Sequence, residues 1–315
     1  MTLQTDVPSR AEPGLAPVGV DFHPDEAYFA LPRRSFGDTS VGIAIGPLRM
    51  VLTGLARGQA SLLRTRFEPF VVPPASSPDL RVSVRDAGVE AFLRSPEVGV
   101  AETYRLKSRT SGRRVVLWSY EFAGWFNPVS REAGVSLVAP EGPLFERGME
   151  NFLRVLVASL SLDLGGFLLH GAGIVREGKA YVYFGPSGSG KTTVCALSPN
   201  DTVLSDDLTL VVKRRGGFEA AGIPFGLAHQ RRPETRASFP IASLNRLVKD
   251  EEIVRVPLTG AQALAEVLCC VPFVLRDPGQ ASRAMQVVGE FVQATPAYRL
   301  HFRKDDAFWD AVEER

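Results

Sequence analysis

Residues 185–192 read Gly-Pro-Ser-Gly-Ser-Gly-Lys-Thr, which fits the pattern GxxxxGK[ST] at every position. Glycines let the backbone curl so that its N–H groups face phosphate oxygens, and a following helix presents its positive end to the same anion. Lys191 would then reach the β- and γ-phosphates, and the Thr192 hydroxyl would bind Mg²⁺. The pattern predicts a loop that binds ATP and Mg²⁺. The expected nucleotide contacts are Gly185, Pro186, Ser187, Gly188, Ser189, Gly190, Lys191, Thr192 and Thr193, of which Thr193 is alternatively helix surface.

Asp206 and Asp207 follow this loop at the end of the next apolar segment. A nucleotide-bound Mg²⁺ needs a carboxylate ligand, and a hydroxyl nucleophile needs a base. Neighbouring residues of an extended strand point in opposite directions. One aspartate could therefore hold the metal and the other accept the proton, in either order. The alternative is a solvated Asp-Asp turn.

His170 and a group of arginines are further candidates. His170 ends an apolar segment before the loop, where a lone histidine is more often structural. Arg231, Arg232 and Arg236 follow the apolar segment 223–225. A guanidinium can bind phosphate through two hydrogen bonds. Arg236, or else Arg232, is therefore a candidate phosphate or substrate clamp, and a solvated basic loop is the alternative.

The elements that would position these residues can be read from hydrophobic periodicity. Apolar residues recur at close to a 3.6-residue period over 145–164, which predicts a helix that the following glycines end. The run 180–184 predicts a strand that leads into the loop, and 192–197 predicts a short helix after it. The segment 201–204 predicts the strand before the two aspartates.

Other segments predict the surroundings of this core. Strands are expected at 208–212 and 298–302, and helices at 260–268, capped by Thr259, and at 285–292. In the first half the expected strands are 67–72, 80–84, 114–120 and 135–138.

Composition places the chain among ordinary globular proteins. Its 315 residues include 36 Lys and Arg against 35 Asp and Glu, for a formal net charge of +1, and 45% are hydrophobic. These values exclude overall disorder and a nucleic-acid binder driven by a global basic excess.

The sequence also predicts a cytoplasmic protein with no membrane partner. Residues 1–20 are Pro-rich, lack the pattern of a signal peptide and are predicted to form a disordered tail. The apolar stretch 152–175 is interrupted by Arg154, Asp163 and His170, so it does not predict a membrane span.

The three cysteines support the same compartment. Cys195 stands alone, and Cys269 and Cys270 are adjacent, which is poor geometry for a disulfide. All three are interpreted as buried apolar thiols in a reducing environment.

Three segments occur in a recognisable order: LLHGAG (168–173), AYVYFGPSGSGKTT (180–193) and VLSDD (203–207). This series resembles the HPr kinase/phosphorylase superfamily, whose core is similar to that of ATP-dependent phosphoenolpyruvate carboxykinase. Both groups place a histidine before the phosphate loop and an Asp-Asp after it. The resemblance implies ATP-dependent phosphoryl transfer to a hydroxyl. The resemblance matches His170 to the active-site histidine. It implies that Asp206 and Asp207 share the roles of metal ligand and general base.

The resemblance covers roughly residues 150–300 and is strongest to divergent HPr-kinase-like proteins. Residues 1–145 carry no motif of the sugar-transport regulator, and its second signature stretch is not apparent. The resemblance therefore does not extend to HPr as the acceptor or to phosphorylase activity.

Together these observations predict an α/β (α+β) protein with a P-loop core containing a mixed sheet. The expected division is a tail (1–20), a smaller, mostly β N-terminal domain (21–148) and a catalytic domain (149–315). The expected activity is Mg²⁺-assisted transfer of the ATP γ-phosphate to a hydroxyl, foremost a serine of a protein or peptide. A small-molecule kinase and a non-catalytic ATP-binding regulatory module are the alternatives. Nucleic acid is not an expected partner, and assembly with a second copy stays open.

Overall fold

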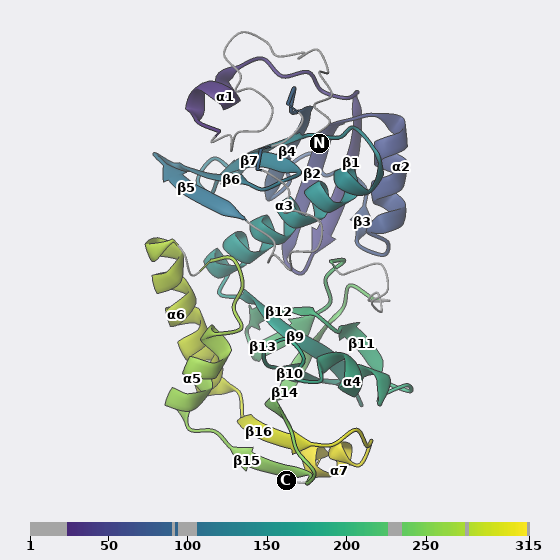
Figure 1. Cartoon of the computed structure of the whole chain (residues 1–315), viewed down its shortest axis with the longest axis vertical. Helices are drawn as coiled ribbons and strands as arrows, with labels where there is room; N and C mark the ends of the chain where they lie inside the picture. The colour runs from purple at the N-terminus through teal and green to yellow at the C-terminus, as the bar shows by residue number, and fades with distance from the viewer. Residues whose placement is uncertain (1–23, 90–91, 94–105, 226–234, 275–276, 314–315) are drawn as a thin grey trace, which may run out of the picture. The chain divides into compact units, whose positions relative to one another are not determined.

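The computed structural model describes residues 24–89, 92–93, 106–225, 235–274 and 277–313 (Figure 1). Over these residues the chain forms two eight-stranded sheets of mixed strand direction, together with helices. This confirms the expected mixed α/β class at its coarse level. The chain divides into two compact units, with a boundary between Leu153 and Arg154. The short segments 44–48 and 66–72 group with the second unit.

The first sheet has the strand order β3-β1-β2-β4-β8-β7-β6-β5. Strands β2, β4 and β8 are parallel neighbours, whereas β5 to β8 form an antiparallel meander. The strands are β1 (Thr39–Ile45), β2 (Leu48–Leu55), β3 (Val71–Val72), β4 (Leu80–Asp86), β5 (Lys107–Ser111), β6 (Arg114–Trp118), β7 (Phe122–Asn127) and β8 (Glu132–Leu137). The accompanying helices are α1 (Glu26–Ala30), α2 (Arg57–Arg66) and α3 (Gly142–Asp163).

The expected strand over 67–72 is wrong for most of its length. Only Val71–Val72 forms a strand, and the preceding residues turn, with the Phe70 N–H donating to the Phe67 carbonyl at 2.7 Å. Phe67 and Phe70 are fully buried, so the apolar pattern reflected burial and not an extended backbone. Helix α2 and the β1–β2 hairpin were not predicted.

Helix α3 confirms the helix expected over 145–164. Gly165 follows it in a left-handed conformation with φ 73°, which a glycine adopts without strain. The N–H groups of Gly165 and Gly166 donate to the carbonyls of Leu162 and Ser161. These bonds satisfy acceptors that the helix end leaves open.

The second sheet curls until β10 and β14, which stand apart in its strand order, pair with each other. That order is β10-β9-β12-β13-β14-β16-β15, and β11 pairs with β9. The parallel β10–β14 pairing closes β10, β9, β12, β13 and β14 into a ring. The strands are β9 (Phe167–Arg176), β10 (Lys179–Phe184), β11 (Thr202–Ser205), β12 (Leu208–Arg214), β13 (Gly217–Ala221), β14 (Ser238–Lys249), β15 (Val254–Pro257) and β16 (Ala297–Phe302).

Helices pack against both faces of this sheet. They are α4 (Lys191–Ala196), α5 (Gly260–Leu268), α6 (Pro278–Ala294) and α7 (Phe308–Glu313). Helices α5 and α6 pack together (Figure 1), and Phe291 of α6 meets Phe167 of β9 edge-on. Val194 of α4 shares a separate core with Ala172 of β9 and Phe308 of α7. Thr259 caps α5 as the sequence predicted, and Gln262 returns the bond to the Thr259 backbone, which was not predicted.

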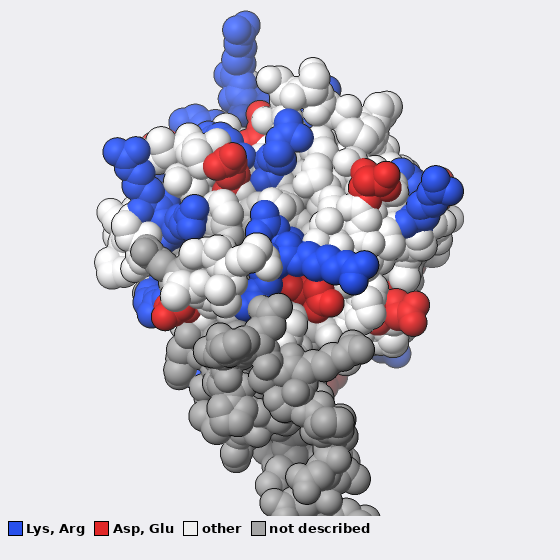
Figure 2. All heavy atoms as spheres, turned by 90° about the horizontal axis from the view of Figure 1, so that it is seen from above, with Lys and Arg blue, Asp and Glu red and all other residues white. Residues whose placement is uncertain are grey.

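Charged side chains of both signs are scattered among uncharged residues on the face shown in Figure 2. Over the described ranges, each helix is too short or too polar to cross a bilayer.

Gly124 on β7 generates a stability prediction. A methyl group here would overlap the ring of Phe152 on α3, and Phe152 is fully buried beside Phe122. Gly124→Ala should therefore lower the stability of the first unit by about 1–3 kcal/mol, because the core must shift to admit it. Calorimetry of the thermal transition measures this.

Gly58→Ala is the matched control. Gly58 is exposed on α2, has no atom near the added methyl group, and has helical neighbours. Its replacement should leave stability unchanged or raise it by up to about 1 kcal/mol. Equal transition temperatures for Gly124→Ala and the unsubstituted protein would contradict the packing account.

Candidate functional site

The glycine-rich loop leaves the end of β10 and enters α4 at Lys191. Gly185 and Gly190 have φ values of 151° and 110°, which side-chain-bearing residues rarely adopt. A side chain on Gly190 would also overlap the Phe302 ring. Both glycines are therefore required by backbone conformation, and Gly190 also by close packing.

Lys191 is buried with its ammonium group turned onto the loop. Its Nζ donates to the carbonyl oxygens of Gly185 at 2.9 Å and Pro186 at 3.1 Å. Burial lowers the pKa of Lys191, and the negative charge of Asp207 opposes this shift. Two of the three donors of the ammonium therefore hold the loop.

His170 lies on β9 beside Asp207. Its Nε2 is 3.5 Å from Asp207 Oδ1, and its backbone N–H donates to the Cys270 carbonyl at 2.8 Å. Burial lowers the pKa of His170, and the charge of Lys191 lowers it further, against an opposing effect of Asp207. The neutral imidazole is therefore favoured at neutral pH.

Asp206 and Asp207 occupy a bend between β11 and β12. The Ser205 hydroxyl accepts the N–H groups of Asp207 at 3.2 Å and Leu208 at 3.0 Å, which stabilises this bend. Asp206 is buried, whereas Asp207 is half-buried and faces His170. The two carboxylates therefore lie in different environments, and neither is a fully solvated turn residue.

The structure brings together His170, Lys191 and Asp207 from β9, α4 and the β11–β12 bend. It does not bring Arg236 to them. Strands β10 and β14 run parallel, and Arg236 comes just before β14 begins, near the start of β10. The glycine-rich loop follows the opposite end of β10. Arg231 and Arg232 lie outside the described residues.

Two residues near the loop were not predicted. Arg246 pairs with Phe184, the last residue of β10, and Cys270 follows α5. Burial raises the pKa of Cys270, and the charges of Arg246 and Lys191 oppose this shift. The interpretation of all three cysteines as buried thiols is therefore wrong for two of them, because only Cys195 is buried, whereas Cys270 is half-buried and Cys269 is exposed after the end of α5. The available signal for Arg246 was a charge inside the apolar strand sequence Leu-Asn-Arg-Leu-Val.

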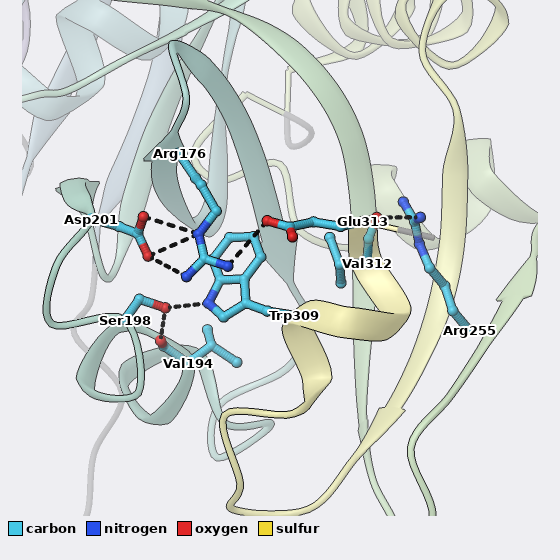
Figure 3. A network of polar contacts seen from close by, with 8 residues as sticks. All are labelled: Arg176, Val194, Ser198, Asp201, Arg255, Trp309, Val312 and Glu313. Carbon is cyan, nitrogen blue, oxygen red and sulfur yellow. Dashed lines mark hydrogen bonds and ion pairs between the residues drawn. The ribbon is translucent and has the colours of Figure 1, made fainter. Parts of the chain in front are cut away.

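A polar network anchors the other end of α4 (Figure 3). The Ser198 hydroxyl donates to the Val194 carbonyl at 2.8 Å and accepts the Trp309 indole N–H at 2.9 Å. Arg176 stacks on Trp309 at 3.8 Å from the ring centre and binds Asp201 through two nitrogens. Helix α7 therefore fixes the helix that carries Lys191.

The donor set bears on which metal the site could hold. Among the residues that the structure describes, no three His, Cys, Asp or Glu side chains gather to bind a metal by themselves. Thr192 is exposed at the start of α4, and Asp206 and Asp207 supply carboxylate oxygens. Mg²⁺ uses one or two protein carboxylates and takes its other ligands from phosphates and water. These oxygen donors fit Mg²⁺ held jointly with a phosphate ligand.

The fold and site define a mixed α/β protein with a glycine-rich loop bordered by a lysine, a histidine and an aspartate. A family model described as "SynChlorMet cassette protein ScmC" matches residues 148–315. Because this match covers more than half of the chain, the protein belongs to that family. No curated protein matches the chain.

The arrangement predicts how His170 titrates. Its pKa should lie below about 6.5, the usual value for histidine. Asp207→Asn should lower it further, because the aspartate charge favours imidazolium. Lys191→Met should raise it, because the lysine charge disfavours imidazolium. NMR titration of ring-labelled histidine measures all three values.

His170→Gln would assign the resonance. A His170 pKa that moves in the same direction in both variants would contradict the proposed electrostatics.

Proposed function

We propose that the protein is an ATP-dependent kinase with a P-loop core like that of the HPr-kinase-like proteins. It transfers the terminal phosphate of ATP to an acceptor hydroxyl, foremost a serine of a protein or peptide. The observation that carries this proposal is the convergence of Lys191, Asp207 and His170 beside the loop. Family membership names no reaction, so the proposal rests on these residues and on the sequence resemblance.

Lys191 is suited to binding phosphate because its charge is buried and partly immobilised. Two of its donors are held by loop carbonyls, which fixes the ammonium in place before a ligand arrives. Fixed charges in a site shielded from water stabilise developing negative charge without reorganising during the reaction. Loop N–H groups would hold the remaining phosphate oxygens.

Asp207 is the residue to which we assign the acceptor's proton. It is half-buried and within reach of the imidazole, whereas Asp206 is buried. The acceptor oxygen forms a bond to the terminal phosphorus while the bond from phosphorus to the bridging oxygen breaks. ADP leaves with that electron pair, and the hydroxyl proton passes to Asp207. His170, favoured in its neutral form, orients this carboxylate.

Mg²⁺, when bound with the nucleotide, would neutralise charge on the phosphate oxygens. Thr192 and Asp206 are the residues that would hold it, with Asp207 as the other carboxylate nearby.

The direct test is incubation of the full chain with Mg²⁺ and γ-labelled ATP, together with candidate protein, peptide and metabolite acceptors. Label on serine of a protein or peptide supports the proposal as stated. Label on a metabolite would support kinase activity but would show that the acceptor is a small molecule. Tight ATP binding with no transfer to any acceptor would favour a regulatory module, and no nucleotide binding would overturn the proposal.

Lys191→Met should reduce transfer on the order of 10³-fold or more, because it removes a preorganised charge from the transition state. Initial rates of label transfer measure this. Lys179→Met is the matched control, since Lys179 is exposed at the start of β10, away from the loop. Equal losses in the two variants would indicate a general effect on folding.

Asp207→Asn should reduce transfer by a similar factor while ATP binding persists, because the amide cannot accept the proton. Rates of label transfer and equilibrium ATP titrations separate the two effects. Asp310→Asn, on the exposed face of α7, should change neither quantity. Normal transfer by Asp207→Asn would exclude Asp207 as the base.

A further inference from the structure

Arg246 lies inside β14 at the point where the neighbouring strand ends and the loop begins. It pairs with Phe184 across the parallel β10–β14 ladder. The residues on either side, Asn245 and Leu247, are buried. The Arg246 side chain is 20% exposed, so it reaches solvent beside the loop.

The guanidinium is held in a defined orientation. Its Nε is 2.5 Å from Glu266 Oε2 on α5, and its Nη1 donates to the Leu247 carbonyl at 2.6 Å. The other oxygen of Glu266 accepts from Arg299 at 2.7 Å. Within the described ranges, Nη2 of Arg246 has no hydrogen-bond partner of its own, so it is available to a ligand.

The same guanidinium lies against the loop. Arg246 Nη1 is 2.8 Å from the position that a Cβ on Gly185 would take, and Ser189 Oγ is 2.9 Å from the same position. Ser189 is only 9% exposed, and its hydroxyl has no hydrogen-bond partner in the described part of the chain. Buried hydroxyls normally have partners. The Ser189 hydroxyl, beside a cation and without a partner, therefore indicates a position where a ligand oxygen would supply the missing hydrogen bond.

Local charges also favour an anion here. Arg246 and Lys191 bring two positive charges to Gly185, because Arg246 Nη1 is 2.8 Å from the position that a Cβ on Gly185 would take and Lys191 Nζ donates to the Gly185 carbonyl at 2.9 Å. Glu266 is shared between Arg246 and Arg299, so it does not neutralise both. Lys191 in turn is next to Asp207 and His170, where the proposed transfer takes place.

We infer that Arg246 is a second cationic ligand of the terminal phosphate, acting beside Lys191, and that Glu266 is the residue that positions it. This inference rests on the proposed function, because it assumes that the loop binds a nucleoside triphosphate. A guanidinium can bind two phosphate oxygens at once, whereas an ammonium acts as a single point charge. Arg246 would therefore distinguish ATP from ADP.

The experiment compares equilibrium titrations of the full chain with Mg-ATP and with Mg-ADP. Arg246→Gln should weaken ATP binding by about tenfold or more, as expected for the loss of a charge-assisted hydrogen bond. ADP binding should weaken by less than about threefold, since ADP lacks the terminal phosphate. Glu266→Gln should shift ATP binding in the same direction by a smaller factor. Arg214→Gln is the control, because Arg214 is exposed at the end of β12 away from Asp207 and also pairs with a glutamate, Glu219. It should stay within about twofold for both nucleotides.

The outcomes separate the two proposals. If the unsubstituted protein binds neither nucleotide, the proposed function fails, and this inference fails with it. If it binds ATP but Arg246→Gln leaves the ratio of ATP to ADP affinity unchanged, only the assignment of Arg246 fails. A purely structural tie between β14 and α5 would weaken both nucleotides equally and so overturn the assignment.

Arg246→Lys covers the case in which the glutamine variant does not fold, judged by circular dichroism. It keeps the charge but cannot bind two oxygens in the guanidinium geometry. ATP should therefore bind more weakly, and ADP should bind as before. Unchanged ATP affinity in Arg246→Lys would also overturn the assignment.

Discussion

The burial of the Lys191 ammonium is the constraint on which the arrangement of the second unit depends. A buried charge is costly unless hydrogen bonds and an opposite charge compensate for it. The loop carbonyls of Gly185 and Pro186 supply the hydrogen bonds, and Asp207 supplies the charge. The two carbonyls belong to the loop that follows β10, the ammonium to α4, and the carboxylate to the β11–β12 bend. The ammonium can therefore be buried only when β10, α4 and the β11–β12 bend have assembled.

Closure of the second sheet provides that assembly. The parallel pairing of β10 with β14 sets Arg246 beside the end of β10, and the antiparallel pairing of β9 with β12 sets His170 opposite Leu208, next to Asp207. Helix α7 holds α4 from its other end through Trp309 and Ser198. Register in a sheet is set by which face of each strand is buried. The same apolar pattern that forms the core thus fixes the charged groups at the loop.

Local patterns predicted much of this unit, because its elements are strongly periodic. Helix α5 and its Thr259 cap, strands β10 and β16, and the glycine end of α3 all follow from neighbouring residues alone. The segment 67–72 failed because Phe67 and Phe70 are buried as turn residues. In that case burial, which periodicity detects, was not accompanied by an extended backbone.

The positions of the charged groups around the loop could not be predicted from local sequence patterns. Arg246 and Cys270 are far from Gly185 in sequence, and only the β10–β14 register and the Cys270 carbonyl bond to His170 bring them to it. A charge within an apolar strand is costly and needs a partner, yet the strand sequence does not say which one. Glu266 supplies that partner from α5, and because it also binds Arg299, it orients Arg246 without cancelling the whole positive charge of the pair. A near-zero net charge for the whole chain therefore coexists with a concentration of charged groups of both signs at one end of β10.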